Sequence, residues 1–437
     1  MPEEYRSQPP RRRRRRKKGI RYWSAKRWKF ELTRLGVLLA LILIIVLLFR
    51  GCKAAVNWVG SLGKEDEPPA AADDAALPED TAPEGPVDAE PEGPTEVSLI
   101  MVGDVLLHDP LQESGLQADG SYDYDHFFAH TSDLISRADL ALVNQEVILG
   151  GKELGLSGYP AFNGAYEVGD ALVKAGFDVV LHATNHALDK GETGLLNCVS
   201  FWENSYPDIA VLGIHGSEES KENNIYYYEV EEATIAILNY TYGTNGIDLP
   251  LPYMVDLLEE DAVIADLQEA NANADFVIAA PHWGLEYTHT PSDEETRWAQ
   301  LFLENGVDLV LGTHPHVIQP VEWLEDESGN KMLVYYSLGN FINFTSDSGD
   351  GVRQRAVGAM AEVTLAVEDG AVSIADYGVT PLIAHMVEGT GSPTVYAIDD
   401  YTQELAAENA MSQKDSKFSL AYCQEICDTV FGDLWRN

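Results

Sequence analysis

The sequence predicts an α/β domain built on parallel strands, preceded by one transmembrane helix. The first observation is a series of short apolar runs, such as Leu309–Leu311, that are bounded by glycine or proline. Such runs are typical of parallel strands covered on both faces. The second is that helix-length segments separate many of these runs, as parallel pairing requires. The third is a single uncharged apolar run near the N-terminus, Leu35–Phe49.

Residues 1–34 form a basic segment that we expect to lie in the cytoplasm. Residues 1–53 contain 16 Lys/Arg and 3 Asp/Glu, whereas the rest of the chain contains 13 Lys/Arg and 68 Asp/Glu. Arg11–Lys18 is an unbroken basic run, a pattern found in nucleic-acid patches and also beside membrane helices. The neighbouring apolar run favours the second interpretation. Because the remaining chain is so acidic, it would repel nucleic acid, and we expect no nucleic-acid partner.

Residues 35–50 are predicted to anchor the chain in the cell membrane as a single-pass helix. As a helix, Leu35–Phe49 covers about 22 Å, which is less than the ~30 Å hydrocarbon core. Arg34 and Arg50 extend this length if their side chains reach to the interfaces. The excess of Lys/Arg before the run places the N-terminus in the cytoplasm and the main domain outside it. A cleaved signal peptide is the alternative, although no small-x-small cleavage site directly follows the run.

Residues 51–96 are predicted to be an acidic, proline-rich extracytoplasmic stalk. Between Lys64 and Glu96 there are seven prolines and twelve acidic residues. Such a composition cannot bury a core. Proline and charge repulsion favour an extended chain of up to ~100 Å, at ~3.1 Å per residue. The stalk is therefore expected to hold the following domain away from the membrane.

The main domain is expected to occupy residues 97–388, and its first half alternates strands with helices. Each predicted strand runs into polar residues. The elements are a strand at Val97–Val102 leading to Asp104, a helix at Tyr124–Ser136, a strand at Leu140–Val143 leading to Glu146, a helix at Tyr166–Ala175, a strand at Phe177–His182 leading to Asn185 and His186, and a helix from Gly191.

The second half continues with further strands, and a helical tail is expected at residues 389–437. Asp369-Gly370 is a strong turn signal between two strands. The elements are strands at Ile209–Gly213, Ile225–Val230 and Thr234–Tyr240, a helix at Val255–Ala270, a strand at Asp275–Ala280 leading to His282, a helix at Asp293–Glu304, the strand Leu309–Leu311 leading to His314 and His316, and strands at Met332–Tyr336, Ala359–Val367 and Ala371–Gly378.

Polar residues at these strand ends predict a metal centre, because ligands of open α/β sheets bind at the carboxyl ends of the strands. Each residue alone has a structural alternative, such as a helix cap or a loop hydrogen bond. The combination of oxygen and imidazole ligands suits Mn, Fe or Zn rather than Ca. Two such ions, about 3.5–4 Å apart, would clamp a phosphate-like or carbonyl oxygen and supply a nucleophile near neutral pH. His186 would protonate a leaving group.

The ordered motifs resemble the poly-gamma-glutamate capsule synthesis protein family (CapA type), within the calcineurin-like metallophosphoesterase superfamily. The residues that carry this resemblance lie between Val97 and Pro381 and comprise Gly103-Asp104, Asn144-x-Glu146, Asn185-His186, His282-Trp283-Gly284-x-Glu286-Tyr287, Gly312-x-His314-Pro315-His316-Val317 and Ser337-Leu338-Gly339-Asn340-Phe341. The resemblance implies a four-layer α/β/β/α sandwich. By similarity the metal ligands are Asp104, Glu146, Asn185, His282, His314 and His316, and the catalytic acid is His186.

Other residues in these motifs are candidates for substrate contact or for support of the ligands. They are His108, Trp283, Glu286 and Asn340. Leu106 occupies the position at which the wider phosphoesterase pattern has histidine, so one ion and a pair of ions are both compatible with the motifs.

The resemblance implies a membrane-anchored extracytoplasmic protein of capsule or cell-envelope polymer biosynthesis, acting as a metal-dependent hydrolase or transferase. The alternative is a non-catalytic envelope component that guides or retains an anionic polymer for a membrane synthase. The expected partners are the anionic polymer, the membrane and membrane-bound synthase subunits. Ligand-type residues in family order favour the enzyme, since a scaffold would not need them.

Overall fold

The computed structural model describes residues 94–231, 233–387 and 392–436. The predicted cytoplasmic head, the predicted membrane anchor at 35–50 and almost all of the stalk lie outside these residues. Within the described part of the chain, no helix is both long enough and apolar enough to cross a bilayer.

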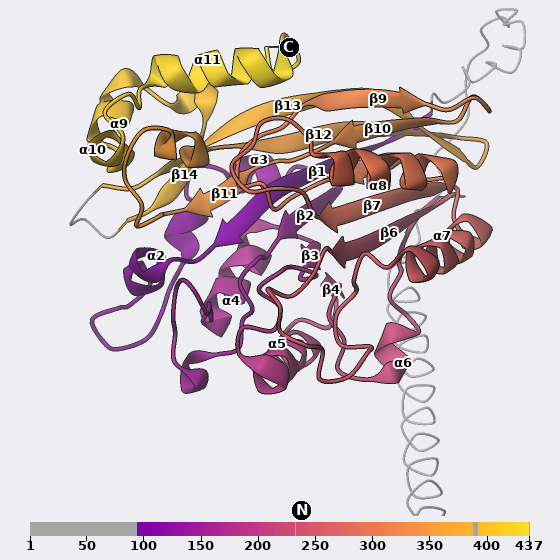
Figure 1. Cartoon of the computed structure of the whole chain (residues 1–437), viewed down its shortest axis with the longest axis horizontal. Coiled ribbons are helices and arrows are strands. Elements are labelled where there is room, and N and C mark those ends of the chain that lie inside the picture. The colour runs from indigo at the N-terminus through magenta and orange to yellow at the C-terminus, as the bar shows by residue number, and fades with distance from the viewer. Residues whose placement is uncertain (1–93, 232, 388–391, 437) are drawn as a thin grey trace, which may run out of the picture. The chain divides into compact units, whose positions relative to one another are not determined.

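Two β-sheets form the centre of the domain (Figure 1). In spatial order, the first contains β14 (Thr394–Ala397), β13 (Ala371–His385), β12 (Val357–Glu368), β1 (Thr95–Leu106), β2 (Leu140–Asn144), β3 (Val179–Leu181) and β4 (Ala210–Leu212), with β11 (Asn340–Asn343) also paired to β1. The second contains β5 (Tyr226–Val230), β6 (Ala233–Thr241), β7 (Phe276–His282), β8 (Leu309–Leu311), β10 (Lys331–Tyr335) and β9 (Val321–Glu325).

Both sheets have a run of parallel strands; the first sheet has antiparallel strands at one margin and the second at both. Strands β1 to β4 run parallel to one another, and β11 is also parallel to β1. In the second sheet, β6, β7, β8 and β10 are parallel. The hairpin of β12 and β13 turns at Asp369 and Gly370, as predicted, and both residues have positive φ. The parallel strands of each sheet therefore bring their carboxyl ends to one edge.

The longer helices cover the outer faces of the sheets, and the shorter ones form parts of the connections between strands. They are α2 (Asp109–Ser114), α3 (Ser132–Ile135), α4 (Tyr166–Ala175), α5 (Gly191–Ser205), α6 (Glu218–Lys221), α7 (Glu260–Asn273), α8 (Asp293–Glu304), α9 (Gln403–Glu408), α10 (Met411–Lys414) and α11 (Leu420–Phe431). The 3₁₀ segments are η1 (Asp125–Phe128), η2 (Lys152–Leu154), η3 (Val352–Ala356) and η4 (Ile398–Asp400).

The apolar core divides into three clusters, and these define the layers. Because side chains alternate along a strand, Leu99 and Met101 of β1 face the second sheet, whereas Ile100 and Val102 face the helices. One cluster fills the space between the sheets, a second joins the first sheet to α4 and α5, and a third joins the second sheet to α7 and α8. The result is a mixed α/β fold with the layers helix, sheet, sheet and helix (Figure 1).

The predicted elements match best where the sequence signal is strongest. Helices α4 and α8 have the predicted bounds, and α8 begins with a capping box between Ser292 and Glu295. The helix predicted at 124–136 is instead two short segments, η1 and α3, separated by a turn. The helix predicted from Val255 begins only at Glu260, because residues 255 and 257 form β-bridges with neighbouring segments. Strands β9, β11 and β14 were not predicted.

Helices α9 to α11 occupy the C-terminal segment and lie beside β13 and β14 (Figure 1). Cys423, Cys427 and Phe431 of α11 are buried in the same cluster as the residues between the two sheets. The C-terminal helices therefore share the core of the strands that carry the strand-end residues.

Candidate metal centre

The predicted ligands converge at the carboxyl ends of the strands of both sheets. Asp104 lies near the end of β1 and His282 is the last residue of β7, whereas Asn340, a predicted supporting residue, follows β10 and begins β11. Glu146, Asn185 and His186 follow β2 and β3, and His314 and His316 follow β8. All of these side chains are buried.

Glycine lets the strand ends come this close. A Cβ atom at Gly103 would lie 1.9 Å from the carbonyl oxygen of Gly339, and one at Gly312 would lie 2.1 Å from that of Tyr336. The amide of Asp104 donates to the Gly339 carbonyl over 2.9 Å. Any larger residue at either glycine would push β1 or β8 away from the neighbouring segment, which explains why glycine belongs to both motifs.

The loop after β8 holds two histidines in a backbone conformation that non-glycine residues rarely adopt. His314 has φ 97° and His316 has φ 57°. Such residues cost of order 1–3 kcal/mol each and persist where the surrounding structure fixes them. The Tyr287 amide donates to the carbonyl of Pro315, between the two histidines, over 2.8 Å. The loop therefore directs both imidazoles toward the same group of residues.

Glu146 is the centre of two groups of potential metal ligands. One comprises Glu146, His282 and His314, and the other comprises Asp104, Glu146 and His316; in each, the ligand atoms lie within 4.8 Å of one another. Glu146 Oε1 is 3.8 Å from His282 Nε2 and 3.6 Å from His316 Nε2. Glu146 could therefore contribute to the binding of an ion in either group.

Several buried ligand atoms lack a hydrogen-bond partner within the described residues. They are both carboxylate oxygens of Glu146 and Nδ1 of His314. Burying a polar group without a partner costs several kcal/mol, and burying an isolated charge costs more. Bound cations would remove this cost. The donor set, which consists of carboxylates and imidazoles, therefore fits divalent metal ions.

Neighbouring side chains hold the ligands in place. Asn144 Nδ2 donates to Asp104 Oδ1 over 2.8 Å. Thr313 Oγ1 lies 3.0 Å from His282 Nδ1, on the side of the ring away from Glu146. Asn340 Oδ1 lies 3.1 Å from His316 Nδ1, and its Nδ2 donates to the His316 carbonyl. Partners of this kind fix the orientation of metal-binding rings and carboxylates.

Asn185 joins the same cluster through its carbonyl oxygen. Its Oδ1 lies 3.0 Å from His282 Nε2, the ring nitrogen that faces Glu146. Its Nδ2 donates to Asn245 Oδ1 over 3.4 Å. The amide is therefore oriented with its oxygen toward the ligands.

His186 forms a pair with Asp189 at the margin of the cluster. Its Nδ1 lies 2.7 Å from Asp189 Oδ2, and its Nε2 lies 3.8 Å from Glu146 Oε1. Asp189 Oδ2 also accepts the amide of Phe162, whose ring packs edge-on against His186 at 4.6 Å. The ring is thus held with Nε2 directed toward the metal ligands, where it could exchange a proton with a bound group.

Burial and mutual charge shift the protonation of the metal-free cluster. Burial raises the pKa of Glu146 well above its ordinary value and lowers the pKa values of His282 and His314. Burial also lowers the pKa of His316, but the charges of Glu146 and Asp104 outweigh it and raise this pKa to about 9. Binding of a metal ion here would therefore displace protons from this cluster, so it should be weaker at low pH.

The remaining predicted residues occupy different surroundings. His108 is half-buried and packs edge-on against Phe162, with ring centroids 5.3 Å apart. Asn340 holds His316, as described above, whereas Glu286 is exposed to solvent. Trp283 points away from the metal ligands. It is fully buried in the core between the second sheet and α8, and its indole donates to the Tyr336 carbonyl over 2.9 Å.

Some residues of the site had little or no signal in the sequence. Thr313 and Asn144 hold ligands, but Thr313 is an unspecified position of its motif, and Asn144, although it is part of a motif, was given no role in the predicted site. Asp189 follows His186 by three residues, a spacing that could have indicated the pair. Tyr242, whose ring centroid lies 4.6 Å from that of His314, comes from the end of the distant strand β6.

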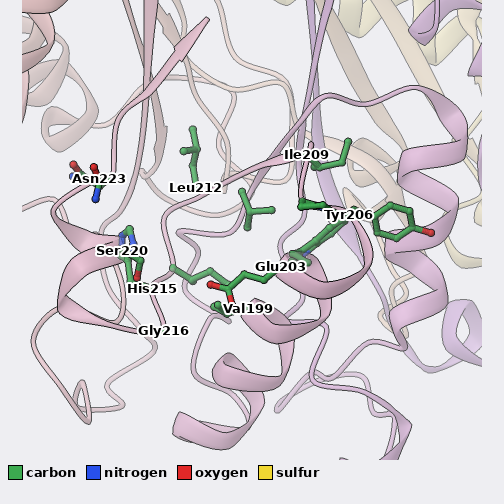
Figure 2. Close-up of a pocket in the computed structure, with 14 residues that line it drawn as sticks. Val199, Glu203, Tyr206, Ile209, Leu212, His215, Gly216, Ser220 and Asn223 are labelled. Carbon is green, nitrogen blue, oxygen red and sulfur yellow. The ribbon is translucent and has the colours of Figure 1, made fainter. Parts of the chain in front are cut away.

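A separate pocket of about 340 Å³ lies between α5, β4 and α6, and none of the metal ligands lines it. Figure 2 shows His215 and Ser220 on one side of this pocket and Tyr206 on the other. His215 Nε2 is 2.8 Å from Asp256 Oδ2, and Lys221 Nζ is 2.7 Å from Asp256 Oδ1. These contacts tie α6 to the segment before α7, so they have a structural role.

Comparison with known proteins gives a family match over most of the domain. The family model described as bacterial capsule synthesis protein PGA_cap matches residues 98–345, more than half of the chain. The PGA biosynthesis protein CapA of Bacillus subtilis (strain 168) is 32% identical over 176 residues, which cover 38% of this chain and 42% of that protein. The alignment thus spans less than half of that relative. The capsule biosynthesis protein CapA of Bacillus anthracis is 25% identical over 345 residues, 74% of this chain and 77% of that protein.

The structure also aligns with two solved structures, one named as a phosphoesterase and one as a phosphatase. The calcineurin-like phosphoesterase YfkN from Bacillus subtilis aligns with a TM-score of 0.40 at 14% identity, covering 76% of this chain and 99% of that one. A phosphatase from Mycoplasma pneumoniae aligns with a TM-score of 0.37 at 15% identity, covering 66% of this chain and 94% of that one.

Proposed function

This chain belongs to the family of bacterial capsule synthesis proteins, and from that premise we propose that it is a metal-dependent hydrolase or transferase of metallophosphoesterase type. Its proposed substrate is an anionic cell-envelope polymer that resembles poly-gamma-glutamate. The observation that carries this proposal is Glu146, a buried carboxylate that has no hydrogen-bond partner among the described residues and belongs to two groups of candidate ligands.

The proposed cofactor is a pair of divalent ions, Mn, Fe or Zn. Glu146, His282 and His314 would hold one ion, and Asp104, Glu146 and His316 would hold the other. The Asn185 oxygen is placed to complete the first group. Mixed carboxylate and imidazole ligands favour these metals over Ca. When bound, such ions act as Lewis acids on a phosphoryl or carbonyl oxygen and provide a nucleophile at neutral pH.

His186 is the proposed general acid. Its Nε2 would give a proton to the leaving group, and Asp189 would hold Nδ1 and stabilise the charged ring. Phe162 packs against the ring and restricts its rotation. Asp189 is a positioning residue in this scheme, since it acts on the reaction only through His186.

The proposed place of action is outside the cytoplasmic membrane. In this proposal residues 35–50 anchor the chain, the stalk carries the domain away from the bilayer, and membrane-bound synthase subunits deliver the polymer. The support comes from charge: the basic head precedes the apolar run, and the acidic segment follows it.

The test is to measure metal content and turnover on the same preparation of the full-length chain. Elemental analysis by mass spectrometry would give the number of metal ions per chain. Turnover would be measured with bis(4-nitrophenyl) phosphate and, separately, from the length distribution of poly-gamma-glutamate, each with added Mn²⁺. For the wild type we expect two ions per chain and metal-dependent turnover. The Glu146→Gln variant should bind neither ion and show no turnover.

Two other results would change the conclusion. A wild-type chain that binds no metal would contradict the metal centre itself. A chain that binds two ions but turns over neither substrate would favour the second function, a non-catalytic component that retains the polymer. Binding of poly-gamma-glutamate without cleavage would then be the activity to measure.

A further inference from the structure

Arg355 lies beside the metal centre, although it comes from a different element. It belongs to η3, and its backbone carbonyl accepts a 3.0 Å hydrogen bond from Asn340 Nδ2. The other end of the same amide, Asn340 Oδ1, lies 3.1 Å from His316 Nδ1. One side chain thus holds both a metal ligand and the backbone of Arg355, so the arginine has a fixed position relative to the centre.

The guanidinium of Arg355 is stacked on an aromatic ring of the site. Its central carbon lies 3.5 Å from the centroid of Tyr287, and that ring lies 6.0 Å from the ring of His316. Stacking of this kind holds a cation in place without neutralising it. Burial lowers the pKa of His108 to about 4, and the charges of His316 and Arg355 also lower it. The positive charge therefore acts on His108, which packs against the same Phe162 ring as His186.

Arg355 retains unused hydrogen-bonding capacity. Its two side-chain hydrogen bonds to described residues both come from Nη1, to Asp347 Oδ2 at 2.7 Å and to Thr345 Oγ1 at 3.1 Å. Its Nε is buried and has no partner among those residues. The Asp347 side chain is 60% exposed, whereas that of Arg355 is 13% exposed. Only the Asp347 end of this ion pair is exposed, so water can solvate the Asp347 carboxylate when another anion takes its place at the guanidinium.

Arg353, two residues earlier in the same turn, also has a buried Nε without a partner among the described residues, but its ion pairs differ from those of Arg355. Its Nη1 lies 2.8 Å from Asp350 and 2.7 Å from the buried Asp415, and its guanidinium stacks on Tyr422 of α11. Two carboxylates thus neutralise Arg353, one of them buried, and its contacts join η3 to the C-terminal helices. Arg353 is a structural arginine, which makes it a matched control for Arg355.

A polyanionic substrate needs a local cation in this domain. Residues 97–437 contain 12 Lys/Arg and 56 Asp/Glu, so the surface as a whole repels anions. Arginine binds carboxylate and phosphate groups through paired donors. We propose that Arg355, stacked on Tyr287, binds an oxyanion of the substrate, either a carboxylate or a phosphate. In the absence of substrate, Asp347 forms an ion pair with the guanidinium, and the substrate anion replaces it. This inference rests on the proposed function of the adjoining centre.

The test is oxyanion binding by the full-length chain, measured by calorimetry. The probes are inorganic phosphate and a short γ-linked glutamate oligomer, each with metal-loaded and with chelator-treated protein. Arg355→Gln should weaken binding about 10- to 100-fold, as expected for the loss of charge-assisted hydrogen bonds. The affinity of Arg355→Lys should lie between those of the wild type and Arg355→Gln, because lysine keeps the charge and loses the planar donors. Asp347→Asn should tighten binding several-fold, because it removes the competing carboxylate.

The control variant is Arg353→Gln, which should lower the melting temperature and leave both affinities unchanged. Weaker binding of either probe by Arg355→Gln alone supports the inference, and the probe affected identifies carboxylate or phosphate. Wild-type affinity in Arg355→Gln, equal losses in both arginine variants, or no measurable binding by the wild type would each overturn it. The measurement does not require turnover. A chain that binds anions through Arg355 but cleaves nothing would refute the hydrolase and leave this inference intact.

Discussion

Glu146→Gln is the most direct perturbation of the metal centre, because this one carboxylate belongs to both ligand groups. Glutamine keeps the shape of the side chain and removes the charge and one oxygen acceptor. The variant should therefore lose both ions. Variants of residues that belong to one group only should lose a single ion: His314→Ala from one group, and Asp104→Asn from the other.

The magnitude follows from ligand-linked stability. At a metal concentration 100 times the dissociation constant, one bound ion stabilises the native state by about 2.7 kcal/mol. In a domain of this size, each kcal/mol shifts the melting temperature by about 2 °C, so one ion should raise it by roughly 5 °C. Wild-type protein should show at least this rise when Mn²⁺ is added, and Glu146→Gln should show none. The metal-free variant should be at least as stable as metal-free wild type, because it no longer buries an ionisable group that lacks a hydrogen-bond partner within the described part of the chain.

The assay combines metal analysis with thermal unfolding, with and without Mn²⁺. Glu295→Gln is the matched control, since Glu295 is also completely buried but caps α8, where its Oε2 accepts the Ser292 amide. It should change the melting temperature and keep two ions. Two ions in Glu146→Gln, or an equal loss of metal in Glu295→Gln, would refute the assignment of Glu146 as the shared ligand.

The His186→Ala variant should keep both ions and the wild-type melting temperature, while its turnover falls ~10²–10⁴-fold. Asp189→Asn should cause a smaller fall in turnover. If His186→Ala instead loses stability and keeps normal specific activity, His186 is a structural histidine. Protease added to intact cells should degrade residues 97–437 and spare the head around Arg11–Lys18, and a protected domain would contradict the proposed topology. Burial raises the pKa of Asp308 from 3.8 to about 6, so between these values the native state holds this proton more tightly than the unfolded state, and stability falls as pH rises. Asp308→Asn should remove that fall. If the melting temperatures of the variant and the wild type change with pH in the same way between pH 4 and 7, this reasoning is wrong.

The sequence alone was sufficient to identify the strand ends and the family. A buried parallel strand is apolar on both faces, as Leu99 to Val102 show in β1, so the pattern identifies it without knowledge of its neighbours. Helix α8 was predicted with its bounds because the Ser292 and Glu295 capping signal is local. The family motifs likewise depend on residues a few positions apart.

Tertiary structure decided which of these residues meet, because their contacts join distant parts of the chain. Asp104 and His316 are 212 positions apart in the sequence, yet Asp104 Oδ2 lies 3.0 Å from His316 Nδ1. The sequence offered no sign that Glu146 is shared by two ligand groups. Trp283 stands in the same motif as His282, yet the alternation of side chains along the strand sends it into the core beside α8.

Arg355 shows the same limit most clearly. In the sequence it is one of two arginines in a short turn, and nothing local distinguishes it from Arg353. The fold places one against the C-terminal helix and the other over Tyr287 at the metal centre. Local patterns determine which side chains stand at the end of each strand, since they depend on neighbours within a few residues. The packing of the two sheets determines what each side chain contacts, since those partners come from segments that only the folded chain brings together.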